Sequence, residues 1–270
     1  ASIAAVRSQG YKGWLDAQMD RSPTQTGWDW LMSDGRFNTT ALEYAQHGAD
    51  HMIWKQLMTS SDELRKRVAL AWSEILVVST STVDGEGPSF AMAAYWDLLN
   101  RHAFGNFRSL LGDITLNPAM GRFLNTLNNV KEDVNKGRYP DENFAREVMQ
   151  LFTIGLYQLN RDGTHKLSGG KPIETYNQDT VTNLARVFTG YRLDTTGHVR
   201  PSNPLQARNP MRFDDTRHSK LNVSFLGTTI AGSTPGPQKL KQALDTLFNH
   251  PNVAPFICKQ LIQRLVTSNP

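Results

Sequence analysis

The stretch PDENFAREVMQLFTIGLYQL, residues 140–159, carries the clearest structural signal in this chain. Asp141 is a good helix N-cap, Pro140 precedes it, and Glu142 adds an acidic side chain to the first turn. Polar residues recur at helical spacing, so they share one face of the predicted helix. This polar stripe consists of Asn143, Arg146, Glu147, Gln150 and Thr153. The stripe is an active site, a buried scaffold or a wetted surface, and its pattern alone leaves these three alternatives open.

Helical periodicity also dominates the rest of the chain. The stretches that show it are residues 2–19 (interrupted near Gly10), 39–58, 60–78, 89–104, 106–115, 117–127, 177–190, 237–250 and 251–266. We therefore predict a mainly α fold, in which residues 1–270 form one domain arranged as a bundle-like helical array.

Two segments depart from the helical pattern. Asp162-Gly163 lies between short alternating runs, which predicts a β-hairpin insertion at 157–177. Residues 191–236 show no long periodicity and are expected to form an irregular basic loop region, with a short strand pair at 222–232. Long irregular segments inside a compact domain are usually functional or disordered.

Charge is unevenly distributed along the chain. Residues 190–270 hold 10 Lys and Arg against 4 Asp and Glu, whereas residues 1–189 hold 19 against 21. A basic segment attracts anionic partners, here an anionic polysaccharide or an acidic protein, and self-assembly is a further possibility. The arginines are spread through Pro-, Asn- and Gly-rich sequence without interleaved aromatics, so no nucleic-acid partner is expected. The sequence contains no run of about 20 apolar residues, so we predict no membrane span.

Cysteine and histidine limit the chemistry that the chain can support. One cysteine, Cys258, excludes an internal disulfide and cysteine-rich metal sites, and its apolar helical surroundings predict a buried side chain. Glu43, His47 and His51 are spaced for one helix face, but Glu43 lies outside the His pair, unlike in a zinc-protease motif. We predict no metal site, and no motif points to a cofactor.

Two clusters could carry chemistry. In the polar stripe, Glu147 would be a general acid or base and Arg146 an anion-binding group, unless both belong to a structural network. The segment DDTRHSK, residues 214–220, gathers acidic, basic and imidazole side chains in the basic loop. Its members could position a substrate or could brace the loop. The candidate residues are Glu147, Arg146 and His218 for catalysis, and Asn143, Arg212, Arg217 and Asp215 for binding.

Five stretches together resemble a known family: LRKRVALAWSEILVVS, YWDLLNRHAFGNFRSLLGDITLNPAMGRFL, PDENFAREVMQLFTIGLYQLNRDGT, QDTVTNLARVFTGY and FICKQLIQRLVTSNP. They run in order along nearly the whole chain and resemble the bacterial family known as domain of unknown function 1800. The resemblance implies an exported protein, periplasmic or extracellular, and longer relatives, which agrees with ends that look cut. Family signature positions fall on Asn143, Arg146, Glu147, Thr153 and Gly155, and a later His on His218. Ser219 follows where the family often has Asp, which weakens a His–Asp pairing.

Two functional hypotheses follow. The first is a non-catalytic envelope or extracellular protein that binds or assembles with a partner, which we favour because no known catalytic geometry is visible. The alternative is an exported hydrolase or modifying enzyme acting on an anionic extracellular polymer. In that case Glu147 would be the acid or base, Arg146 and Arg212 would bind anions, and His218 would assist. The enzyme hypothesis requires the polar stripe and the 212–220 loop to meet at one pocket.

Overall fold

The computed structural model describes residues 3–33, 39–42, 44–83 and 87–270, and these are mainly α-helical, as the sequence predicts. Its backbone contacts divide the chain into two compact units. Unit 1 comprises Ala1–Leu110 and Thr195–Arg208, and unit 2 comprises Leu111–Asp194 and Asn209–Pro270. The single-domain, bundle-like arrangement expected from the sequence stays a prediction.

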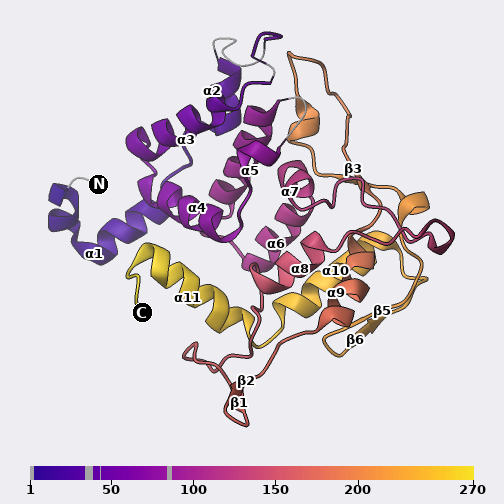
Figure 1. Ribbon diagram of the computed structural model, residues 1–270. Coiled ribbons are helices and arrows are strands. Elements are labelled where there is room, and N and C mark those ends of the chain that lie inside the picture. Colours follow the sequence, from indigo (N-terminus) through magenta and orange to yellow (C-terminus); the bar gives the residue numbers. More distant parts are fainter. Residues whose placement is uncertain (1–2, 34–38, 43, 84–86) are drawn as a thin grey trace. The chain divides into compact units, whose positions relative to one another are not determined.

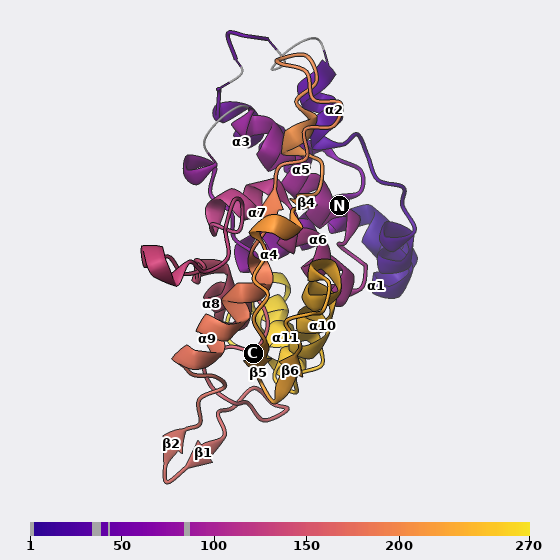
Figure 2. The same ribbon diagram turned by 90° about the vertical axis from the view of Figure 1, so that its right-hand side faces the viewer.

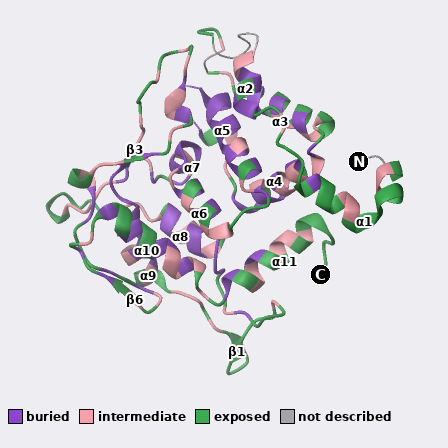
Figure 3. Cartoon of the chain, turned by 180° about the vertical axis from the view of Figure 1, so that it is seen from behind, coloured by how far each residue is buried: buried purple, intermediate pink, exposed green. Residues whose placement is uncertain are grey.

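Unit 1 is built around one buried helix, α5 (Pro88–Arg101), against which its neighbours α2, α3 and α4 pack (Figure 1). The other elements are α1 (Ile3–Met19), α2 (Gly27–Met32), α3 (His47–Thr59), α4 (Glu63–Ile75), η2 (Thr80–Thr82) and η5 (Leu205–Ala207). Nearly every residue of α5 is buried, as Figure 3 shows, and most of its side chains are small or apolar. α1 bends at Gly10, whose φ of 71° breaks the helical backbone where the sequence predicts an interruption.

Asp97 of α5 joins two helices of unit 1 through its carboxylate. The two oxygens accept hydrogen bonds from the backbone N–H groups of Gly27 (2.7 Å) and Trp28 (2.9 Å). These are among the N–H groups at the start of α2 that have no partner within the helix. Burial raises the pKa of Asp97, and the two backbone hydrogen bonds oppose that rise. Asp97 therefore fixes α2 on α5.

The predicted helix at 39–58 is wrong in its first half, because α3 begins only at His47. The Ser89 hydroxyl of α5 donates to the carbonyl of Ala45 (2.5 Å) and accepts from the N–H of Ala49 (3.3 Å). This contact fixes the backbone ahead of α3 and gives the start of the helix a partner that lies 40 residues further along the chain. Glu43, the first member of the histidine stripe, lies outside the described residues.

Unit 2 carries α7 to α11 and all three pairs of described strands. α6 (Phe107–Thr115) leads the chain into it. Its remaining elements are α7 (Pro118–Phe123), η3 (Val134–Lys136), α8 (Asn143–Gln150), α9 (Gln178–Ala185), η4 (Arg186–Phe188), η6 (Asp215–Arg217), α10 (Gly236–Phe248) and α11 (Val253–Leu265). Phe144 of α8 packs edge-on against Phe188, with 4.8 Å between ring centroids, and against Phe152. These buried rings join α8 to η4, and α8 also packs against α9.

The helix in the stretch 140–159 is shorter than the sequence pattern predicts, because α8 spans only Asn143–Gln150. Asp141 caps it as expected, since its carboxylate accepts the N–H of Asn143 (2.8 Å). α8 nevertheless ends at Gln150, and Gly155 adopts a left-handed φ of 70° soon after. Thr153 is fully buried beyond the helix, with its hydroxyl donating to the Val148 carbonyl (2.5 Å). Thr153 therefore does not extend the polar stripe on the α8 surface.

Short strand pairs occupy the two segments that lack helical periodicity. At 157–177, β1 (Leu167–Ser168) pairs with β2 (Lys171–Pro172) around Gly169-Gly170, and the hairpin projects away from α8 and α9 (Figure 2). Asp162-Gly163 forms a separate tight turn, flanked by one bridge between Leu159 and His165. At 191–236, β3 (Tyr191–Arg192) pairs with β4 (Arg212–Phe213), and β5 (Val223–Phe225) pairs with β6 (Thr228–Ile230). The last pair confirms the strand prediction at 222–232.

Candidate functional site

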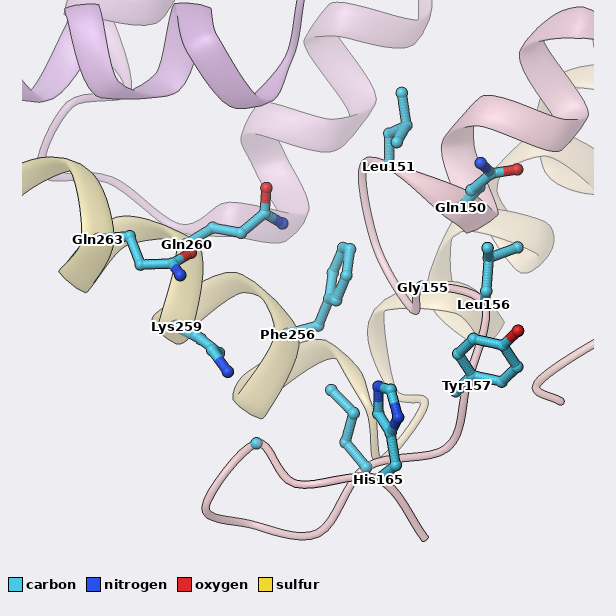
Figure 4. A pocket seen from close by; sticks show the side chains of 12 residues that line it. Gln150, Leu151, Gly155, Leu156, Tyr157, His165, Phe256, Lys259, Gln260 and Gln263 are labelled. Carbon is cyan, nitrogen blue, oxygen red and sulfur yellow. The ribbon is translucent and has the colours of Figure 1, made fainter. Parts of the chain in front are cut away.

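Unit 2 contains a pocket of about 350 Å³ between the end of α8, the segment after it, and α11 (Figure 4). Its lining comes from three parts of the chain: Gln150 and Leu151, residues 155–165, and one face of α11 with Phe256, Lys259, Gln260 and Gln263. Volumes of about 300–1,000 Å³ are typical of small-ligand sites. We call this cavity the unit 2 pocket.

Asn252, just before α11, holds the wall of this pocket in place. Its side-chain amide donates to the carbonyls of Ile154 (2.9 Å) and Tyr157 (2.8 Å) and accepts the N–H of Leu159 (3.0 Å). The side chain is almost fully buried, and buried amides are stable only when such groups are paired. One residue therefore fixes the segment between α8 and the hairpin against α11.

Gly155 and Phe256 form the floor of the unit 2 pocket. A Cβ atom at position 155 would lie 2.8 Å and 2.9 Å from the Cε2 and Cδ2 atoms of the Phe256 ring. Glycine both permits the left-handed backbone and leaves room for the ring. The exposed ring of Tyr157 lies beside that of His165, with centroids 5.2 Å apart. The pocket thus has an aromatic floor and an aromatic side wall.

The polar side chains of the pocket include one buried donor without a partner and one cation. Gln260 Nε2 is buried and has no hydrogen-bond partner among the described residues. Lys259, which is exposed, is the only side chain lining the pocket within the described residues that is cationic at all ordinary pH values. Hydrogen bonds from Thr164 lower the pKa of the nearby Asp162 carboxyl, and the charge of Lys259 lowers that pKa slightly further. A ligand with acceptor oxygens would satisfy the free amide donor.

The polar stripe of α8 faces α9 in a hydrogen-bonded network. The Arg146 guanidinium donates to Glu142 Oε2 (3.2 Å) and to Gln178 Oε1 (2.9 Å). Gln178 Nε2 donates to Glu142 Oε2 (2.7 Å), and the Thr182 hydroxyl donates to Glu142 Oε1 (2.7 Å). Arg146 is therefore paired with protein groups, as a structural role requires. Asn143, predicted as a binding residue, is exposed at the start of the same helix.

Glu147 differs from its neighbours in this network. Its Oε2 atom is buried and has no hydrogen-bond partner among the described residues. Burial raises the pKa of Glu147, and the charge of Arg146 opposes that rise. Burial also raises the pKa of Tyr176, whose hydroxyl lies 3.4 Å from Gln150 Oε1 and which feels the charges of Arg146 and Glu147. A half-buried carboxyl with a raised pKa is suited to proton transfer.

His218 lies in a buried cluster and not at a surface. Its Nδ1 atom lies 2.8 Å from the Thr189 carbonyl and donates to it, and its fully buried Nε2 has no partner among the described residues. Burial lowers the pKa of His218, and the hydrogen bond to Thr189 opposes this. Ser219 beside it donates to Glu132 Oε1 (3.0 Å). Buried Lys239 donates to the Ser219 carbonyl (2.9 Å). The catalytic role suggested for His218 stays a prediction.

The other candidates from the basic loop surround this cluster. Asp215 forms an ion pair with Lys220, and the Arg217 guanidinium donates to the Asn128 carbonyl (3.2 Å). Arg212 lies on the exposed side of β4, opposite Arg192. The structure thus gathers Asp215, Arg217 and His218 in one part of unit 2. Within the described residues, the hydrogen bonds and ion pairs of these three side chains go to groups other than Glu147 and Arg146.

The structure adds residues to the site that the sequence reasoning missed. Phe256, Lys259, Gln260 and Gln263 share one face of α11 at i, i+3, i+4 and i+7, a signal visible in the sequence. The prediction that Cys258 is buried is wrong, because this residue lies on the exposed side of α11. The helical periodicity is correct, but its buried side includes Val253 and Ile257 and not Cys258.

Metal and membrane signals are weak in the part of the chain that the structure describes. The rings of His47 and His51 lie 5.6 Å apart, but no group of three metal-binding side chains occurs among the described residues. Among the same residues, no helix combines the length and apolar character that crossing a bilayer requires.

Comparison with known proteins agrees with the resemblance seen in the sequence. No curated protein and no solved structure matches the chain. The family model described as protein of unknown function (DUF1800) matches residues 1–270, which is the whole chain. The chain therefore belongs to the DUF1800 family.

Proposed function

We propose that this chain is a non-catalytic binding protein whose unit 2 pocket holds a segment of an anionic extracellular polysaccharide. The observation that carries the proposal is the unpaired Gln260 amide in a pocket with an aromatic floor. The apolar face of a sugar ring packs on aromatic side chains, and its hydroxyl oxygens accept hydrogen bonds from amides. The pocket offers both kinds of contact.

Charge favours an acidic sugar over a neutral one. Among the described residues that line the pocket, Lys259 is cationic and none is a carboxylate. Unit 2 as a whole carries 17 Lys and Arg against 13 Asp and Glu. A positive field of this kind raises the association rate and affinity of a polyanion. Export to the periplasm or the extracellular space belongs to the same proposal, and the near absence of cysteine is compatible with it.

A hydrolase acting on the same polymer is the second candidate, and the state of Glu147 favours it. Its unpaired Oε2 and raised pKa provide an acid or base one helical turn before Gln150, which lines the pocket. Glycoside hydrolysis generally needs two carboxyl groups, and the second would come from Glu142, which is already bonded to three side chains. The binding role is therefore the better supported of the two.

Calorimetric titration with acidic and neutral oligosaccharides of matched length tests the binding proposal. We expect saturable binding of an oligouronate and weaker binding of the corresponding neutral oligomer. Lys259→Gln should weaken oligouronate binding about tenfold, from the loss of one charge contact at short range. Lys171→Gln changes an exposed lysine on the β1–β2 hairpin, outside the pocket, and should leave the affinity unchanged.

The results separate the two candidates. Equal affinity of the parent protein and Lys259→Gln for every oligosaccharide would place any binding outside the pocket and refute the proposal. Shortened oligosaccharides in the parent sample, but not in Glu147→Gln, would replace the binding role with the hydrolase role. Product analysis by mass spectrometry makes that distinction directly.

A further inference from the structure

Unit 1 contains a separate cavity of about 510 Å³, lined by residues of α3, α4 and α5 and of the segment after α4. These three helices, labelled in Figure 1, pack against one another. Most of the cavity wall is apolar, with the rings of Trp54, Tyr95 and Trp96 beside aliphatic side chains. The aliphatic residues are Ile53, Leu57, Leu70, Val77, Val78, Met92 and Leu99. We call this cavity the unit 1 pocket. Among the described residues, none lines both this pocket and the unit 2 pocket.

Several polar atoms in its wall already have partners within the protein. The Tyr95 hydroxyl donates to the Leu76 carbonyl (2.5 Å), and Trp96 Nε1 donates to Gln56 Oε1 (2.7 Å). The Ser73 hydroxyl donates to the carbonyl of Leu70 (2.7 Å). A ligand would therefore gain little from hydrogen bonds to these groups and much from apolar contact. The interior of the pocket suits an aliphatic body.

The edge of the pocket has a different character. Trp54 is 65% exposed and Val77 is 39% exposed, although both line the cavity. Asp50, one turn before Trp54 on α3, is the only charged residue that lines it among those described. A carboxylate beside an aromatic face attracts a cation and repels an anion. The edge therefore selects against a negatively charged head group.

We propose that the unit 1 pocket binds a small amphiphile with an aliphatic body and an uncharged or cationic head. The volume lies in the range of small-ligand sites and leaves the body in contact with the aliphatic wall. The head lies at the edge, next to Asp50 and Trp54. This charge preference is opposite to that of the unit 2 pocket, whose described lining residues include a lysine and no carboxylate.

Titration with decylamine, decanol and decanoate below their micellar concentrations tests the proposal. Calorimetry and tryptophan fluorescence should show one saturable site for decylamine and for decanol. Decanoate should bind about tenfold more weakly than decylamine, because one carboxylate at short range repels its head.

Two variants locate the site. Asp50→Lys should reverse the order, so that decanoate binds more tightly than decylamine, and a structural role for Asp50 would not produce this reversal. Trp54→Ala should weaken all three probes about fivefold, through lost apolar contact at the edge. Met58→Ala is the matched control, because Met58 is 77% exposed on the same helix but does not line the pocket.

Three results would overturn the proposal. The first is the absence of saturable binding of any probe to the folded protein. The second is an affinity order that Asp50→Lys leaves unchanged. The third is self-association in sedimentation experiments that Trp54→Ala abolishes while the probes do not bind, which would identify this surface as an interface between copies of the chain.

Discussion

Replacing Gly155 by alanine tests the floor of the unit 2 pocket. The residue has a φ of 70°, and a Cβ there would lie 2.8 Å from the Phe256 ring. The left-handed backbone costs an alanine about 1–2 kcal/mol. Overpacking against the ring adds about 1–3 kcal/mol, and the reduced entropy of the unfolded chain returns about 0.4–1 kcal/mol. We expect Gly155→Ala to lose about 3 kcal/mol of unfolding free energy.

Gly137→Ala is the matched control for this prediction. Gly137 has a similar φ of 63°, but among the described residues no atom outside its immediate chain neighbours lies within 4 Å of a Cβ at that position. Without overpacking, its expected loss is about 1 kcal/mol. Urea unfolding measures both losses, from midpoints at an unchanged slope.

The double variant Gly155→Ala/Phe256→Leu isolates the contact itself. The smaller side chain should relieve the overlap, so the two changes should couple favourably. Equal losses for Gly155→Ala and Gly137→Ala, with no coupling to Phe256→Leu, would show that the ring does not pack on Gly155. Gly155 would then not form the pocket floor together with Phe256.

Three further predictions concern single side chains. Asn252→Ala should cost about 3 kcal/mol, since it removes three hydrogen bonds of about 1 kcal/mol each, and it should abolish oligouronate binding by calorimetry. Asp97→Ala should cost about 2–3 kcal/mol in urea unfolding, because it leaves the first two N–H groups of α2 unpaired, whereas Asp29→Ala on the exposed side of α2 should cost much less. Burial raises the pKa of Glu147, so the folded protein loses stability as pH rises from the ordinary glutamate value through the raised one. Glu147→Gln should therefore unfold at higher urea than the parent at pH 8 and at the same urea at pH 4; a gain of equal size at both pH values would contradict this.

Helices with local start signals could be predicted from the sequence. Asn117 and Asn177 cap α7 and α9, with side chains that accept the N–H groups of Ala119 (2.9 Å) and Thr180 (3.0 Å). Such signals need only neighbouring residues. The start of α3 could not be predicted, because Ser89, far along the chain, bonds the backbone ahead of it.

The candidate site was predicted only in part, for a similar reason. The polar stripe correctly indicates a polar face on α8, but the pattern does not show that the helix stops at Gln150. The unit 2 pocket draws on α8, on the segment that Asn252 fixes, and on a helix about 100 residues later. Periodicity describes each helix face separately and contains no information about which faces meet. Contacts between segments distant in the chain therefore had to come from the structure.

The segment Thr195–Arg208 has a consequence for synthesis and dissection of the chain. The chain passes from unit 2 into unit 1 at Thr195 and returns to unit 2 after Arg208, so this segment is part of unit 1. Within unit 1, Arg200 donates to the Tyr44 hydroxyl (2.8 Å), and the Arg208 guanidinium lies 5.4 Å from the centre of the Trp28 ring. A ribosome must therefore make about three quarters of the chain before its first unit has all its parts. A fragment that stops at Leu110 lacks this piece, so a faithful dissection would supply residues 195–208 through a linker or as a separate peptide.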